Sequence, residues 1–159
     1  MLVCIASDSH NNMENVEKLI SYIKDMEISA AIHCGDICKP EVLLKFEKSG
    51  IFVNAVFGNM DNRDNLTKRL VNSDYVKLFG YIGEFELKGR KIAFMHNLQI
   101  GEKPIGKYDA VFYGHTHIKE KRFSGKTLIA NPGEIAGLRR RASFAVYDTK
   151  RNNIEFVEI

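Results

Sequence analysis

The sequence predicts an α/β fold in which two mixed β-sheets pack against each other with helices outside them. In the first half, short apolar segments alternate with amphipathic segments of helical period, which is typical of parallel strands joined by helices. After about residue 73, closely spaced strand-like segments are separated by polar turns, which is typical of antiparallel hairpins. The 159 residues contain no repeat, low-complexity tract or linker, so we expect one domain over residues 1–159.

Three strands, each followed by a helix, are predicted for the first half of the chain. The strands are expected at residues 2–6, 30–34 and 51–57, and the helices at about residues 13–26, 40–49 and 62–71. In the first helix, apolar residues recur with i, i+3, i+4, i+7 spacing from Val16 onward. Asn11 and Glu14 resemble a capping box at its start. The series favours parallel strands with right-handed crossovers.

One further strand and three hairpins are predicted for the second half. The strand is expected at residues 110–113, and the hairpin strands at 84–87 and 91–95, at 118–123 and 127–130, and at 144–148 and 154–159. Each pair flanks a short polar segment, which is typical of a hairpin turn. A parallel front followed by antiparallel hairpins therefore predicts two mixed sheets in layers.

Composition and charge restrict the class of protein. Hydrophobic residues make up 45% and charged residues 27% of the chain, as in ordinary soluble globular proteins. The formal net charge of +3, from 23 basic and 20 acidic residues, is too balanced to indicate a nucleic-acid polymer as partner. The three cysteines do not make a disulfide framework, which fits a reducing compartment. No apolar run approaches the ~20 residues that span a membrane, so we expect a cytoplasmic protein.

Side chains of metal-binding types follow five of the predicted strands. Asp8 and His10 follow the first strand, Asp36 the second, Asn59 the third, His96 the strand at 91–95, and His115 and His117 the strand at 110–113. Ligands of open α/β sheets bind beyond the carboxyl ends of the strands, so these positions are expected to converge. Residues at i and i+2 of an extended segment point to the same side, so each such pair can reach one metal.

These seven donors exceed what one tetrahedral ion takes. A two-metal centre is the simpler explanation, with a carboxylate between ions ~3.5–4 Å apart. Three of the donors, Asp36, Asn59 and His115, directly follow a glycine. Glycine permits the tight backbone that a strand exit into a site requires. The sequence therefore predicts a two-metal site at one edge of the sheets.

Each donor also has a purely structural explanation. A single Asp or Asn after a strand usually shapes a turn, and a single buried His is usually a hydrogen-bonded core residue. These explanations would have to hold at five strand ends at once, so we favour a metal centre for the set. For His33, inside a strand, and Asp61, in the turn after Asn59, we favour the structural role. Cys34 and Cys38 lack a second cysteine pair and do not indicate a zinc site.

The order of these motifs resembles that of a known family. The motifs are Asp8-Ser9-His10, Gly35-Asp36, Gly58-Asn59-Met60-Asp61, His96 and Gly114-His115-Thr116-His117. They resemble the motif series of the calcineurin-like metallophosphoesterases, most closely the small single-domain prokaryotic phosphodiesterases. That branch also carries an Asn-Pro-Gly turn like Asn131-Pro132-Gly133. The resemblance covers nearly the whole chain and implies a four-layer α-β-β-α sandwich.

The resemblance implies a role for each donor. Asp8, His10 and His117 would hold the first metal ion, Asn59, His96 and His115 would hold the second, and Asp36 would bridge the two. A hydroxide between the ions would attack phosphorus in line, so catalysis would depend most on Asp36, Asn59 and His96. The imidazole and oxygen donors suit Mn²⁺, the usual activating ion of the family, with Fe²⁺, Zn²⁺, Ni²⁺ and Mg²⁺ as alternatives.

Two positions depart from the family pattern. Many larger relatives have His after the metal-binding Asn, where it can protonate the leaving oxygen. Met60 occupies that position and cannot transfer a proton, as in the small phosphodiesterase branch, where the position is not a fixed His. Relatives usually have Gly after the ligand that corresponds to His96, where this chain has Asn97. Asn tolerates left-handed backbone better than most residues, so we expect the loop to keep its shape.

Three functions are compatible with these residues. The first is a phosphodiesterase that hydrolyses a small phosphodiester. The second is a non-catalytic metal-binding scaffold of the same fold, as in the retromer subunit; Met60 favours it, and the full set of histidines opposes it. The third is a phosphomonoesterase, which shares the whole metal centre. Small members of the family often pair, so the resemblance also allows a homodimer.

Basic residues and one loop give further expectations. Arg63 is a candidate for substrate binding because a guanidinium suits phosphate, although a solvated helix position is favoured. The arginines at 139–141 could line an anionic groove, but such a charge run is more often a solvated loop. The short segment 97–107 contains Gly101, Pro104 and Gly106 and suggests an open cleft without a large lid.

Overall fold

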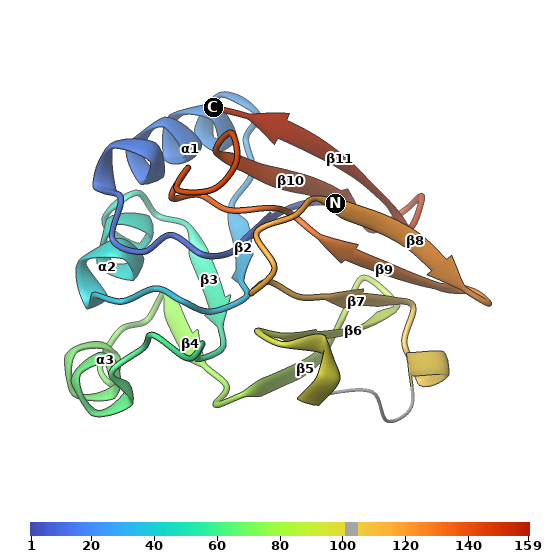
Figure 1. Ribbon diagram of the computed structural model, residues 1–159, viewed down its shortest axis with the longest axis horizontal. Coiled ribbons are helices and arrows are strands. Elements are labelled where there is room, and N and C mark those ends of the chain that lie inside the picture. The colour runs from blue at the N-terminus through green and yellow to red at the C-terminus, as the bar shows by residue number, and fades with distance from the viewer. Residues whose placement is uncertain (101–104) are drawn as a thin grey trace.

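Two mixed β-sheets pack face to face in the computed structural model, which describes residues 1–100 and 105–159 (Figure 1). The α/β prediction with two mixed sheets is therefore confirmed. The expectation of an open cleft over the segment 97–107 depends on residues 101–104, which lie outside the described residues. Within the described residues, no helix is long and apolar enough to cross a membrane.

The first sheet has six strands in the order β11-β10-β1-β2-β3-β4. Their bounds are Leu2–Ala6 for β1, Ala30–His33 for β2, Phe52–Ala55 for β3, Val76–Leu78 for β4, Ser143–Asp148 for β10 and Asn153–Glu158 for β11. Strands β1 to β4 are parallel, whereas β10 is antiparallel to both β1 and β11. No sequence pattern predicted the edge strand β4, because three residues are too few to show a period.

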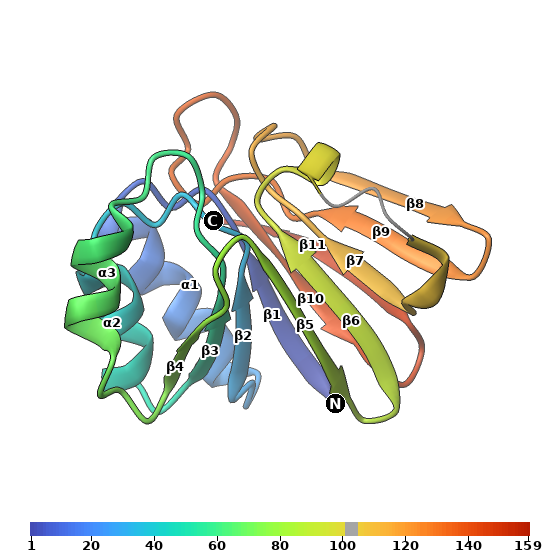
Figure 2. The ribbon, with the colours of Figure 1, turned by 90° about the horizontal axis from the view of Figure 1, so that it is seen from below.

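Three α-helices cover one face of the first sheet (Figure 2). They are α1 (Met13–Asp25), α2 (Pro40–Lys48) and α3 (Arg63–Leu70). Each connects two neighbouring parallel strands, and the strands β1 to β4 follow one another in space. Right-handed crossovers in one direction place every connecting helix on the same face. The other face of this sheet is therefore free to pack against the second sheet.

The start of α1 differs from the prediction. Asn12, not Asn11, caps the helix, and its side-chain oxygen accepts a hydrogen bond from the Asn15 N–H at 3.2 Å. The predicted capping box of Asn11 with Glu14 is therefore wrong, because the capping residue is one position later. Asn11 instead has left-handed backbone, with φ of 60°. Asn12 also donates to the carbonyl of Ala136 at 2.9 Å, so a contact distant in sequence fixes where the helix starts.

The second sheet has five strands in the order β5-β6-β7-β9-β8. Their bounds are Ile82–Leu87 for β5, Arg90–Met95 for β6, Ala110–Phe112 for β7, Glu120–Ser124 for β8 and Thr127–Asn131 for β9. Strands β6, β7 and β9 are parallel, whereas β5/β6 and β8/β9 are antiparallel pairs. The three predicted hairpins are thus all confirmed, the third being β10/β11.

The apolar core lies in layers between these elements. Successive residues of β1 alternate between layers, with Cys4 facing the helices and Ile5 facing the second sheet. On the outer face of the second sheet, Met95 and Val111 pack beneath Leu98 of a 3₁₀-helix (Leu98–Ile100). In the described part of the chain, the helices of this fourth layer are two 3₁₀-helices, the second being Ile105–Lys107.

Candidate metal centre

All seven predicted ligands lie in one continuous chain of side-chain contacts. The nitrogen–oxygen distances along it are 3.2 Å for His117–Asp8, 3.9 Å for Asp8–His10, 3.7 Å for His10–Asp36, 3.4 Å for Asp36–His96, 3.0 Å for His96–Asn59 and 3.0 Å for Asn59–His115. Both sheets contribute, because the carboxyl ends of β1, β2 and β3 meet those of β6 and β7. The structure therefore brings together donors from five separate segments.

The backbone at the centre is strained where the donors leave the strands. Positive φ angles occur at Asp8 (52°), His10 (41°), Asp36 (53°), His115 (68°) and His117 (62°). Left-handed backbone is unfavourable for residues other than Gly, and such strain collects at functional sites. The surrounding fold thus holds these five side chains in positions that the free chain would not favour.

The three glycines before the donors are required by close approach. A Cβ on Gly35 would lie 2.8 Å from the Gly58 nitrogen, and the φ of Gly35 is +92°. A Cβ on Gly58 would lie 2.1 Å from Asp36 Oδ1, and one on Gly114 would lie 1.9 Å from Ser7 Oγ. Each distance is far below van der Waals contact, so a larger residue would displace the site loops. The predicted need for glycine at these strand exits is confirmed.

Asp8, His10 and His117 form the first half-site. Asp8 Oδ1 lies 3.2 Å from His117 Nε2 and 3.9 Å from His10 Nε2. Among the described residues, both Asp8 Oδ1 and His10 Nε2 are buried and lack a hydrogen-bond partner. Burial raises the pKa of Asp8, partly offset by the Ser7 hydroxyl and by charges on the histidines. A buried unpartnered oxygen is costly, and a bound cation would supply the missing partner.

His117 is oriented by a buried carboxylate that was not predicted. Its Nδ1 lies 2.9 Å from Glu134 Oε2, so that Nδ1–H donates and Nε2 presents a lone pair to Asp8. Carboxylates commonly orient metal-binding histidines in this way. The sequence signal for Glu134 was its place directly after the turn Asn131-Pro132-Gly133, but only the fold brings that turn beneath His117.

Glu134 also holds the loop that follows it. Its two oxygens accept backbone N–H groups from Leu138 at 2.9 Å, Arg139 at 2.7 Å and Arg140 at 2.6 Å. Burial alone would raise the pKa of Glu134, but these donors and His117 hold it below the ordinary value. One ionised, fully buried carboxylate therefore links a candidate metal ligand to the arginine loop.

Asn59, His96 and His115 form the second half-site. Asn59 Oδ1 lies 3.0 Å from His96 Nε2 and 3.0 Å from His115 Nδ1. His96 Nδ1 lies 2.9 Å from the Cys34 carbonyl and donates its hydrogen there, which leaves Nε2 toward the centre. The two imidazole rings are nearly perpendicular, with centroids 5.1 Å apart. Two nitrogens and one oxygen therefore converge, as a cation site requires.

Asp36 lies between the two half-sites. Its Oδ2 is 3.7 Å from His10 Nε2 and 3.4 Å from His96 Nε2, and its Oδ1 accepts the Met60 N–H at 2.9 Å. Burial opposes ionisation, but the His96 and Met60 hydrogen bonds outweigh it and lower the pKa of Asp36. Burial likewise opposes a charged His96, but Asp36 outweighs it and raises the pKa of that imidazole. Asp36 is thus a carboxylate in position to contact both half-sites.

Two neighbouring residues have the expected structural roles. His33 is buried in β2, with its Nε2 3.1 Å from Ser9 Oγ, and burial lowers its pKa to about 3. Asp61 accepts the N–H of Gly58 at 2.7 Å and that of Cys38 at 2.6 Å. It therefore ties two site loops together and does not cap α3, whose cap is Asn62.

Arg63 contacts two aromatic side chains. Its guanidinium lies 5.3 Å from the centroid of the Phe57 ring and 4.8 Å from that of Tyr81, and it donates to the Tyr81 hydroxyl at 3.2 Å. Substrate binding by Arg63 stays a prediction. Asn97 does not have left-handed backbone, so the tolerance of Asn for that conformation is not needed at this position. Its side chain instead accepts the Gln99 N–H at 3.0 Å and shapes the turn.

Comparison with known proteins agrees with this arrangement. Residues 1–152 match the calcineurin-like phosphoesterase superfamily domain. A phosphodiesterase of Methanocaldococcus jannaschii is 31% identical over 165 residues, which cover 100% of this chain and 98% of the relative.

Two solved structures support the same fold. An archaeal phosphodiesterase is 28% identical and superposes with a TM-score of 0.90 over 100% of both chains. Vps29 of Chaetomium thermophilum is 15% identical, with a TM-score of 0.72 over 100% of this chain and 93% of that one, and shows the fold alone. The match along the chain and the identity to the relative confirm the predicted family. The chain belongs to the calcineurin-like phosphoesterase superfamily.

Proposed function

We propose that the protein is a phosphodiesterase that hydrolyses a small phosphodiester at a two-metal centre. The observation that carries the proposal is the unbroken contact chain of seven donors, with the carboxylate of Asp36 at its middle. The phosphodiesterase relative at 31% identity supports the same reaction. Two divalent ions would supply a water nucleophile at neutral pH and stabilise charge on the phosphoryl oxygens.

The donor set fits such ions. The first half-site would hold one ion and the second half-site the other, with Asp36 contacting both. The ligand atoms of Asp8, His10 and His117 lie within 4.8 Å of one another, as do those of Asp8, Asp36 and His96. The two groups share Asp8, so the half-sites adjoin. Imidazole and oxygen donors without a thiolate suit Mn²⁺, our first choice, and also Fe²⁺ or Zn²⁺.

The residues at the candidate metal centre would bind and orient the substrate, but Met60 provides no proton for the leaving group. Met60 is 60% exposed beside Asn59, and its thioether has no proton to donate. Its backbone N–H donates a hydrogen bond to Asp36 Oδ1. We therefore expect diesters with good leaving groups, such as phenolates, to react much faster than those with alkoxides.

Removal of Asp36 tests the proposal. Asp36→Ala is expected to abolish Mn²⁺-dependent hydrolysis of bis(p-nitrophenyl) phosphate, because both half-sites lose a shared donor. Asp25→Ala, at the exposed end of α1, is the matched control and should keep full activity. Circular dichroism should show both variants folded. Equal rates for the two variants would contradict the proposal.

Phosphomonoesterase activity would use the same donors. The substrates p-nitrophenyl phosphate and bis(p-nitrophenyl) phosphate have the same leaving group and differ in the charge of the phosphorus group, so their rates can be compared. We expect the diester to be preferred. A strong preference for the monoester would replace the proposed reaction with the alternative one.

A metal-binding scaffold is the second candidate function. Met60 favours it, because the position beside Asn59 lacks a proton donor. Calorimetric titration with Mn²⁺, followed by assays on both esters, separates the candidates. Tight binding of Mn²⁺ without turnover of either ester would favour the scaffold. The homodimer also stays a prediction, which sedimentation velocity would test.

A further inference from the structure

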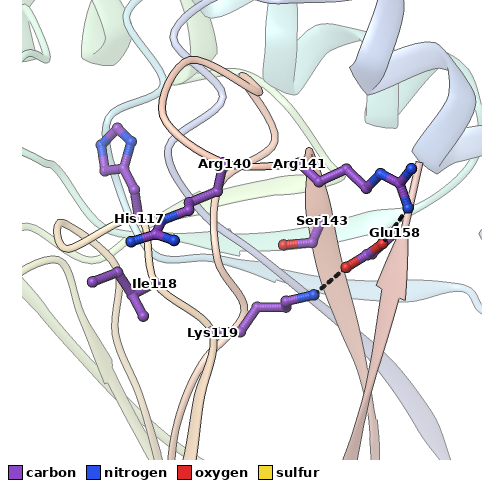
Figure 3. A pocket seen from close by; sticks show the side chains of 7 residues that line it. All are labelled: His117, Ile118, Lys119, Arg140, Arg141, Ser143 and Glu158. Atoms are coloured by element: carbon purple, nitrogen blue, oxygen red, sulfur yellow. Dashed lines mark hydrogen bonds and ion pairs between the residues drawn. The ribbon is translucent and has the colours of Figure 1, made fainter.

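A cavity of about 320 Å³ opens beside His117 (Figure 3). It is lined by His117, Ile118, Lys119, Arg140, Arg141, Ser143 and Glu158. His117 is both a wall of this cavity and a member of the first half-site. A phosphodiester bound at the candidate metal centre could therefore extend one ester arm into the cavity.

The cavity carries one cation that no acidic side chain neutralises. Glu158 forms ion pairs with Lys119 and with Arg141, the latter at 2.9 Å. The guanidinium of Arg140 has no ion-pair partner among the described residues. Figure 3 shows the Arg140 side chain extending toward the side of His117 and Ile118. The Arg141 side chain extends in the opposite direction, toward Glu158. Arg140 is thus the cation available to a ligand.

The position of Arg140 is fixed relative to the candidate metal centre. Its backbone N–H donates to Glu134 Oε1 at 2.6 Å, while Glu134 Oε2 lies 2.9 Å from His117 Nδ1. One buried carboxylate therefore sets the distance between the arginine backbone and a candidate metal ligand. Arg139 donates to the same oxygen at 2.7 Å, but its side chain does not line the cavity.

A second cavity, which His115 of the second half-site lines, has a different character. It has a volume of about 340 Å³ and is lined by Asn97, Leu98, Gln99, Tyr113, Gly114, His115 and Thr116. None of these lining residues is an acidic side chain, a lysine or an arginine. The two cavities would therefore treat the two arms of a diester differently.

We propose that Arg140 is a substrate-binding residue that recognises an anionic oxygen group on one arm of the phosphodiester. The substrate class is then a diester with one arm that ends in a carboxylate or phosphate and another that is uncharged. A guanidinium matches either anion with paired hydrogen bonds. The inference rests on the proposed phosphodiesterase function and adds which diesters it selects.

Three p-nitrophenyl phosphodiesters with different second arms test the proposal. The arms are carbamoylethyl, carboxyethyl and phosphonoethyl, so the leaving group is constant and only the charge of the arm changes. With Mn²⁺, the parent protein should show kcat/KM about tenfold higher for the anionic arms, as for an exposed charge-assisted contact. The faster of the two anionic substrates identifies the preferred anion.

Matched arginine variants identify the residue responsible. Arg140→Ala should bring the anionic-to-neutral ratio of kcat/KM close to one by lowering the rates on the two anionic substrates. Arg139→Ala keeps the same backbone hydrogen bond to Glu134 and should retain the parent ratio. If Arg140→Ala lowers the rates on all three substrates equally, the residue is structural and the proposal is wrong.

The rates of the parent protein on the three diesters test this proposal separately from the phosphodiesterase function on which it rests. Hydrolysis of all three diesters at equal rates would leave the phosphodiesterase function intact and overturn the role of Arg140. Hydrolysis of none of them would overturn the phosphodiesterase function, and the proposed specificity with it. Equal loss of preference in Arg139→Ala and Arg140→Ala would assign the effect to overall charge and overturn the role of Arg140.

Discussion

The two half-sites hold similar donors in different surroundings. In the first, Asp8 and His117 are buried, and two polar atoms lack partners among the described residues. In the second, Asn59 and His115 are exposed, and the Asn59 oxygen already contacts both imidazoles at 3.0 Å. The first half-site therefore contains buried polar atoms without a hydrogen-bond partner in the described part of the chain, whereas the donor atoms of the second half-site already contact one another.

This difference predicts unequal affinity for metal ions. A cation at the first half-site gains the buried oxygen of Asp8 without displacing a hydrogen bond, and low solvent access strengthens the attraction. At the second half-site a cation would have to replace the contacts of Asn59 with His96 and His115. We therefore expect the first ion to bind more tightly than the second.

The largest expected effect is the loss of the Asp8 carboxylate. Asp8→Ala should abolish the tighter of the two Mn²⁺ binding events and all diester hydrolysis. Asn59→Ala should weaken only the looser event, because its oxygen belongs to the exposed half-site. Calorimetric titration with Mn²⁺ measures both. The comparison fails if Asn59→Ala removes the tighter event and Asp8→Ala does not.

Bound metal should stabilise the fold strongly. At a free Mn²⁺ concentration of 100 times Kd, the free energy of unfolding should rise by about 2.7 kcal/mol per site. Thermal unfolding with Mn²⁺ and with a chelator measures the shift. Asp8→Ala should lose most of this shift and Asn59→Ala little of it at low Mn²⁺. An equal loss in both would show that the half-sites bind metal equally.

Glu134 should contribute to the first half-site alone. Glu134→Gln removes the charge that orients His117 and should weaken the tighter Mn²⁺ event by roughly 10–100-fold. Glu155→Gln, on an exposed residue of β11, is the control and should bind as the parent does. If the looser event changes instead, Glu134 does not act through His117.

The smallest effect concerns His33, which contacts Ser9 between Asp8 and His10. Its pKa of about 3 in the fold lies below the ordinary 6.5, so the unfolded chain binds a proton first as the pH falls. Its contribution to stability is therefore complete above pH ~6.5 and is lost progressively toward pH ~3.

The pH dependence of unfolding in the chelated protein measures this contribution. Between pH 7.5 and 5.5, the free energy of unfolding of the parent should fall by about 1 kcal/mol more than that of His33→Gln. The slopes are compared rather than the absolute stabilities, since the substitution also changes a buried hydrogen bond. Identical slopes would show that His33 is not held neutral by burial.

Much of the fold and most of the site could be predicted because the signals are local. Apolar segments such as 2–6 and 110–113 predicted strands, and the glycines before Asp36, Asn59 and His115 marked their exits. The strand β4 was missed because it is short, and the Asn12 cap because Ala136 fixes the start of α1. Those two features depend on contacts that a sequence window does not contain.

The sequence by itself determined the donors and the side of the sheets on which they lie. Strand periodicity and parallel connections place Asp8, Asp36 and Asn59 at carboxyl ends before any packing is considered. Only the tertiary structure decided that Glu134 lies beneath His117 and that Arg140, not Arg63, lines a cavity beside it. The loop after β9 packs against His117 and makes those contacts, which join residues 17 or more positions apart in the sequence.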